Sequence, residues 1–252
     1  MKAALRAEWT KTRTVAGPRW LLLGSVVLTI ALGVAVTSLM SCAAGGCHDD
    51  TTKLSLTGVY LGQALIVILA VQSISGEYGS GLIRTTLAAI PRRGTVLAAK
   101  ALTLTGLVAA SGTVAVLGSL LAGRIILPGN GFTAPSLADG PTLRATTGSV
   151  LYLVLIALLS LGVAAVVRDS AAGTGIVLGL LYVFPLLSQV IADPRWQRLL
   201  ERIGPMSAGL AVQTTTDPDT LPAGPWAGLG VTAGWAVAAL VAGGLLLRVR
   251  DA

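Results

Sequence analysis

The chain has 252 residues, of which 54% are hydrophobic and only 12% are charged, and its formal net charge is +7. Soluble domains carry about 25% charged residues, so this composition, with a mean hydropathy of +0.80, excludes an ordinary soluble protein and indicates a membrane protein. The pI near 10.0 would also suit a nucleic-acid-binding protein, and the positions of the charges decide between these explanations.

Residues 1–18 predict a helix that lies on the membrane surface. Leu5 and Trp9 share one helical face, while Lys2, Arg6 and Arg13 lie on another, which suits contact with anionic headgroups. A basic leader before an apolar run is also typical of a secretory signal peptide. The run 20–39 is longer than the about 7–15 residues of a signal h-region, so we expect a retained helix.

Six windows of the chain are long and apolar enough to cross a bilayer. A spanning helix needs about 20 mostly apolar residues, and unpaired backbone groups in hydrocarbon make helices the expected form. The predicted spans are 20–39, 57–74, 101–122, 145–167, 170–192 and 224–247. Lys100 directly precedes the third span, and we expect its ammonium to extend towards the headgroups. The predicted fold class is therefore an all-α integral membrane protein with one transmembrane domain over residues 1–252.

Basic residues concentrate in the loops of one side. The N-terminal leader, the stretch 80–100, Arg168 and the C-terminal tail carry twelve Lys and Arg residues, whereas the other loops carry six, together with seven acidic residues. Cytoplasmic loops are enriched in Lys and Arg, so both termini and the stretch 80–100 are predicted to be cytoplasmic. This topology explains the high pI, and a nucleic-acid partner becomes unnecessary.

The first outer loop holds both cysteines of the chain. Cys42 and Cys47 could close a small disulfide ring across CAAGGC outside the cytoplasm, or remain free thiols. The only histidine, His48, lies beside them, but nothing in so short a loop fixes a metal-binding geometry. We therefore expect no metal site.

Residues 193–204 predict an amphipathic helix on the outer membrane surface. Asp193 can cap the helix, Pro194 suits its first position, and Gly204 ends it. Its apolar stripe consists of Trp196, Leu199, Leu200 and Ile203.

A second short amphipathic helix is predicted over residues 80–90, between the second and third spans. Its apolar face consists of Ile83, Leu87 and Ile90. The opposite face, with Gly81, Arg84, Thr85 and Ala88, is small and polar and would permit close approach of another surface. Pro91 and the pair Arg92-Arg93 follow. This pattern indicates a docking element at the membrane surface.

The spans lack the chemistry of an intramembrane enzyme. They contain no Asp, Glu, His or Arg, so neither a catalytic constellation nor an ion-coupling group is predicted there, and we expect no enzyme activity and no cofactor. Three glutamines, Gln63, Gln72 and Gln189, could line a transport path, but interhelical hydrogen bonds are the favoured interpretation for each. Gln63 and Gln72 lie about 180° apart on a helix and cannot face one pore together. No GxxxxGK[ST] loop occurs in the chain, so an ATPase would be another chain.

The stretch from Glu77 through Gly81 to Pro91, Arg92-Arg93 and Lys100 resembles the cytoplasmic signature of type-2 ATP-binding cassette (ABC) exporter permeases. The segments AEWTKTRT before the first span and GEYGSGLIRTTLAAIPRRGTVLAAK after the second are similar to the actinobacterial branch of that family.

The resemblance implies a permease subunit in a bacterial cytoplasmic membrane. It implies an N-terminal connecting helix, a coupling helix over 80–90, a cytoplasmic ABC ATPase subunit as partner, and a second permease in a homo- or heterodimer. The residues that it assigns to ATPase coupling are Glu77, Gly81, Arg84, Thr85, Pro91, Arg92 and Arg93. The alternative is a polytopic membrane protein that assembles partners and transports nothing.

Overall fold

Helices account for all regular secondary structure in the part of the chain that the structure describes. This computed structural model describes residues 2–42, 49–89, 93–136, 139–216 and 221–249. The long helices are α2 (Ala16–Leu39), α4 (Val59–Gly79), α6 (Arg93–Ile126), α7 (Gly140–Val167), α8 (Ser170–Val190) and α11 (Pro225–Val249). The shorter elements are α1 (Lys2–Thr14), α3 (Thr51–Ser55), α5 (Leu82–Ala89), η1 (Leu127–Asn130), α9 (Pro194–Ile203), α10 (Pro205–Leu210) and η2 (Ala211–Gln213).

The six predicted spans are confirmed as six helices that are long and apolar enough to cross a membrane, so the chain is an all-α, multi-pass membrane protein. Four of these helices extend at least four residues beyond their apolar windows: α2 begins at Ala16, α4 continues to Gly79, α6 begins at Arg93 and α7 begins at Gly140. Hydropathy marks only the part of a helix that lies in hydrocarbon. Local backbone geometry decides where the helix itself ends.

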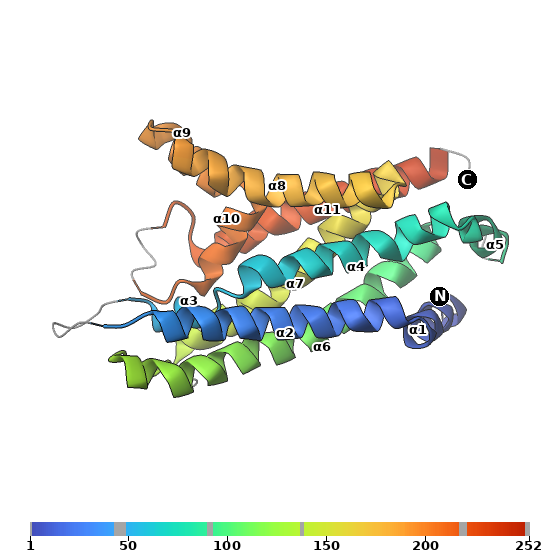
Figure 1. The fold of residues 1–252 in the computed structure, drawn as a ribbon. Helices are drawn as coiled ribbons and strands as arrows, with labels where there is room; N and C mark the ends of the chain where they lie inside the picture. Colours follow the sequence, from blue (N-terminus) through green and yellow to red (C-terminus); the bar gives the residue numbers. More distant parts are fainter. Residues whose placement is uncertain (1, 43–48, 90–92, 137–138, 217–220, 250–252) are drawn as a thin grey trace.

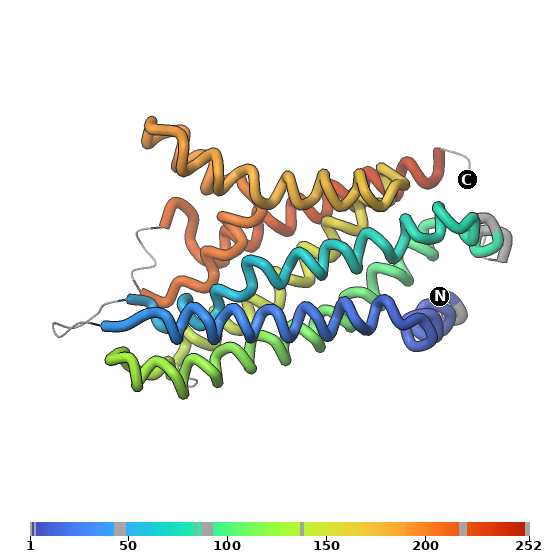
Figure 2. The backbone as a smooth tube through the Cα atoms, viewed as in Figure 1, coloured from blue at the N-terminus to red at the C-terminus, as the bar shows by residue number. Residues whose placement is uncertain are grey.

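The long helices run side by side, and both chain termini lie at the same end of the bundle (Figures 1 and 2). We call this the terminal end, and it also carries α1 and α5. The opposite end, with α3, α9 and α10, is called the loop end. These two ends define where each candidate residue lies.

The helix α7 forms the centre of the bundle. It packs against α4, α6, α8 and α11, and it is the most buried of the six spanning helices. At its crossing with α11 the backbones touch: a Cβ added at Gly162 would lie 2.5 Å from the Ala239 carbonyl carbon, and one added at Gly243 would lie 2.8 Å from the Gly162 carbonyl oxygen. Small residues allow such approach, which lets dispersion forces hold helices together in lipid.

The helix α8 lies at the edge of the bundle and leads into α9 at the loop end (Figure 1). The predicted amphipathic helix over 193–204 is confirmed as α9, with the Asp193 Oδ1 accepting a hydrogen bond from the Arg195 backbone at 2.8 Å. No residue of α9 is buried, and Trp196 remains 58% exposed. Its apolar stripe is therefore available to lipid.

Candidate functional site

The predicted short helix between the second and third spans is present as α5, at the terminal end. Ile83 is buried, whereas Leu82 is 52% exposed and Thr85 is exposed. The side chains of Arg84 and Leu87 lie outside the described part of the chain, as do Ile90, Pro91 and Arg92 entirely. The helix therefore buries part of its apolar face and presents Thr85 outward.

Gly81 has a different role from the one predicted. Its φ of 71° lies in the left-handed region, and a Cβ added there would meet no atom within 4 Å. Gly81 thus forms the turn between α4 and α5, where glycine tolerates the backbone conformation. The prediction that it lies on a small helical face for close packing is wrong.

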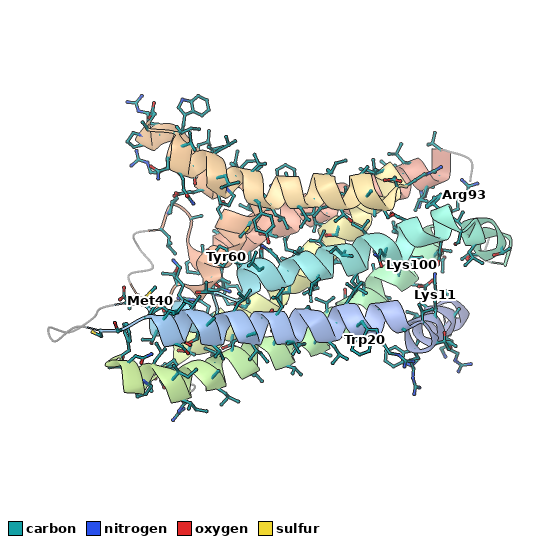
Figure 3. All side chains as sticks on the ribbon, viewed as in Figure 1. Lys11, Trp20, Met40, Tyr60, Arg93 and Lys100 are labelled. Atoms are coloured by element: carbon teal, nitrogen blue, oxygen red, sulfur yellow. The ribbon has the colours of Figure 1, made fainter. Side chains whose placement is uncertain are left out.

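Four charged side chains from three helices meet at the terminal end, and we call them the charge cluster: Glu8, Lys11, Glu77 and Lys100. The Lys100 ammonium donates to Glu77 Oε1 at 2.6 Å, to Glu8 Oε1 at 2.9 Å and to the Ser73 carbonyl at 2.9 Å. Lys11 also donates to Glu77 Oε1. Figure 3 shows Lys11 and Lys100 at the end of the bundle that carries Arg93.

The Lys100 side chain is buried within the charge cluster. The Lys100 side chain is 1% exposed, and its three donor positions match three acceptors, so the cost of removing the ammonium from water is offset by full hydrogen bonding. The prediction that this ammonium extends to the headgroups is wrong. The tertiary fold brings carboxylates from α1 and α4 to it instead.

Sequence reasoning missed Glu8 and Lys11. The residues of α1 that face the bundle are Ala4, Glu8 and Lys11, which share one helical face, whereas Trp9 is 51% exposed. One feature of the sequence could have identified Glu8. Glu8 is the only acidic residue of a strongly basic leader, where topology gives an acid no purpose.

Two arginines at the terminal end contact other parts of the chain. Arg93 begins α6 and donates to the Leu247 carbonyl at 2.7 Å, near the end of α11. The Arg168 guanidinium lies 5.0 Å from the centroid of the Tyr78 ring, a cation–π distance. Both contacts join spanning helices that are not consecutive in the chain, α6 with α11 and α7 with α4, so charged groups contribute to holding this end together besides apolar packing.

A cavity of about 420 Å³ adjoins the charge cluster. Its polar wall includes Glu77, Lys11 and Lys100, and its apolar wall includes Leu69 and Leu104. The turn from α1 into α2 and residues of α4 and α6 line it. This combination makes the cavity amphipathic.

The three glutamines lie in three different places. Gln63 is buried, accepts a hydrogen bond from the Tyr152 hydroxyl and donates to the Tyr60 carbonyl at 2.9 Å. The interhelical hydrogen bond predicted for it is confirmed. Gln72 is exposed and lines the cavity beside the charge cluster, while Gln189 is exposed and lines a cavity of about 300 Å³ at the loop end.

The carboxylate of Asp50 connects two segments at the loop end of the molecule through hydrogen bonds. Asp50 accepts hydrogen bonds from the Lys53 backbone at 3.0 Å, from the Thr215 hydroxyl at 2.7 Å and from the Thr216 backbone at 3.2 Å. Burial raises the pKa of Asp50, but these hydrogen bonds outweigh burial and hold the pKa below its ordinary value. The contacts bind the start of α3 to the segment before α11.

Cys42 is disulfide-bonded, and its backbone N–H donates to the Asn130 carbonyl at 2.9 Å. Cys47 and His48 lie outside the described residues. Among the residues that are described, no group of three or more His, Cys, Asp or Glu side chains could hold a metal ion.

Compared with protein-family models and with curated proteins, the sequence matches none of them. The assignment of a candidate site is therefore based on the geometry of this chain alone.

Proposed function

We propose that this chain is the membrane-spanning permease subunit of an ABC exporter. It would move a substrate across the bacterial cytoplasmic membrane, with ATP hydrolysed by a separate cytoplasmic ATPase subunit. The chain itself would have no enzyme activity and no cofactor. A second permease subunit would complete the transporter.

The observation that carries this proposal is α5. It is a separate eight-residue helix between two spanning helices, joined to α4 by the turn at Gly81, with Ile83 buried and Thr85 exposed. Such a helix can receive a push from a partner on its exposed side and pass it to α4 and α6. Rigid-body motion of packed helices is an established way to open one side of a membrane protein and close the other.

The charge cluster supports the same role for the terminal end. It ties α1, α4 and α6 through side chains that are almost wholly buried, apart from Lys11, which is 40% exposed. A displacement of α5 would therefore move these three helices together. The excess of basic residues at this end supports a cytoplasmic location, where an ATPase subunit has access.

The proposal predicts that a gene next to the one for this chain encodes a cassette ATPase, and it is tested by coexpressing the chain with that ATPase. We expect the ATPase to co-purify with the chain and to hydrolyse ATP. Thr85→Arg places a large cation on the exposed side of α5 and should reduce co-purification at least about tenfold, as expected for disruption of an interface centre. The matched control is Thr133→Arg, also an exposed threonine but in the connection at the loop end, which should have no effect.

Two outcomes would contradict the proposal. One is the absence of any co-purifying ATPase, which would favour the alternative of a membrane protein that assembles partners without transport. The other is equal loss of the ATPase with both arginine variants, because a specific contact at α5 predicts an effect of Thr85→Arg alone.

A further inference from the structure

The cavity beside the charge cluster has the two-part lining of a site for an amphiphile. Leu69, Leu104 and Leu107 supply apolar walls, and the charge cluster supplies one polar end. Its volume of about 420 Å³ falls within the range of about 300–1,000 Å³ that is usual for small-molecule sites. A purely polar ligand would leave the leucine walls exposed to water, and a purely apolar ligand would leave the charged groups without hydrogen-bond partners.

The cavity lies near the ends of the spanning helices that line it, where we expect a bilayer to change from hydrocarbon to headgroups. Gly17 and Pro18, at the start of α2, line it, and so does Glu77, near the end of α4. Trp20 follows Pro18 closely, is 72% exposed and lies at the same end of the bundle (Figure 3). Exposed tryptophans near the ends of spanning helices are typical of the membrane interface.

One buried oxygen atom of the charge cluster lacks a hydrogen-bond donor among the described residues. Glu77 Oε1 accepts hydrogen bonds from both Lys11 and Lys100, but Oε2 is buried without a partner among the described residues. The Glu77 side chain is only 4% exposed. A buried carboxylate oxygen left unpaired is costly, so the site favours a ligand that donates an N–H or O–H group.

The charge balance restricts the ligand further. Two carboxylates and two ammonium groups already cancel within the cluster. A purely cationic or purely anionic headgroup would leave a net charge in a largely buried site, whereas a zwitterion would not. Lys11, the most exposed member, is placed at the cavity to meet a phosphate while Glu77 Oε2 meets an ammonium.

We propose that this cavity binds the headgroup of a phospholipid that carries both a phosphate and a primary ammonium, such as an ethanolamine phospholipid. The ammonium donates to Glu77 Oε2, the phosphate pairs with Lys11, and the acyl chains leave along the apolar walls into the bilayer. The site does not depend on the proposed ATPase partner, and it is tested without one.

The test uses the full-length chain in nanodiscs made of equal amounts of ethanolamine, choline and glycerol phospholipids with identical acyl chains. After extraction into mild detergent, native mass spectrometry counts the lipids retained by each protein molecule. We expect ethanolamine lipid to exceed choline lipid about tenfold, because a quaternary ammonium has no N–H to donate to the carboxylate.

A pair of variants locates the site. Gly76 lines the cavity, and a Cβ added there would meet no atom within 4 Å, so Gly76→Phe fills the cavity without disturbing the backbone. It should abolish retention of the ethanolamine lipid. The matched control is Gly79→Phe, on the same helix, where a Cβ is equally unhindered but the residue does not line this cavity, and retention should be unchanged.

The proposal is overturned by equal retention of ethanolamine and choline lipids, by preferential retention of the glycerol lipid, or by persistence of the ethanolamine lipid in Gly76→Phe. Equal loss in both phenylalanine variants would also overturn it. The headgroup preference is measured on the unchanged chain, so the proposal can be refuted even if Gly76→Phe fails to fold.

Discussion

Replacing Lys100 with methionine removes one ammonium from the buried part of the charge cluster. The side chains of its carboxylate partners, Glu77 and Glu8, are only 4% and 13% exposed, so they recover little hydration when the ammonium is lost, and Lys11 alone then faces two carboxylates. Breaking a buried ion pair by deleting one partner costs about 3–5 kcal/mol, because it leaves an uncompensated buried charge. We expect Lys100→Met to lower the free energy of unfolding by about this amount.

The measurement is reversible unfolding of the purified protein in mixed micelles by titration with SDS, followed by the fluorescence of its tryptophans. Lys11→Met is the matched control, because Lys11 contacts the same Glu77 oxygen but is 40% exposed, and a pair open to solvent contributes about 1 kcal/mol or less. The double variant Glu77→Gln with Lys100→Met removes both charges. It should be less destabilised than the sum of the two single variants.

Two results would refute this reasoning. If Lys100→Met costs no more than Lys11→Met, burial of the cluster does not control its energetics. If the double variant equals the sum of the single variants, Glu77 and Lys100 do not interact in the folded protein.

Three further predictions concern other parts of the molecule. Asp50→Asn should cost about 1–3 kcal/mol at neutral pH through lost charge-assisted hydrogen bonds. The pKa of Asp50 is lowered on folding, so its carboxylate stabilises the folded protein fully only above the pKa of the unfolded chain, at about pH 4. The difference in unfolding free energy between the unchanged protein and Asp50→Asn should therefore disappear as the pH falls through the folded pKa. A difference that does not change with pH would contradict this. In the same unfolding assay, Gly243→Ala should destabilise the protein by about 1–3 kcal/mol, because the added Cβ would collide at the α7–α11 crossing. Gly234→Ala, whose Cβ would meet no atom within 4 Å, should be neutral or stabilising. Equal effects of the two variants would show that the crossing is not tightly packed. Maleimide labelling under denaturing conditions should modify no cysteine before reduction and both cysteines after it, and labelling of Cys42 without reductant would exclude its disulfide.

Much of the fold was predictable because lipid restricts what a backbone can do. Every window of about 20 apolar residues must become a helix when its backbone groups find no water, and all six windows did. The capped helix α9 was also predictable, since Asp193, Pro194 and Gly204 act within a few residues of one another. The ends of α2, α4, α6 and α7 were less accurate, because these helices continue into the membrane interface, where hydropathy no longer marks them.

The candidate site was predictable only in part. Glu77 stood out as an acid in a basic stretch, and Glu8 carried the same signal, but neither sequence position indicates a common partner. Lys100 lies 92 residues from Glu8 and 23 from Glu77, and only the packing of α1 and α4 against α6 brings their atoms together. The role of Gly81 depends likewise on a backbone angle that a helical wheel does not contain.

The sequence by itself determined that this protein is a six-helix membrane protein with an amphipathic helix between its second and third spans, because hydrophobic periodicity and capping act locally and need no knowledge of neighbouring helices. Tertiary structure alone decided that Lys100 is enclosed by two carboxylates, that Gln63 meets Tyr152, and that a cavity opens beside the charge cluster. The physical reason is distance: ion pairs and cavity walls depend on a few ångströms between helices, and these follow from how small residues let the helices approach.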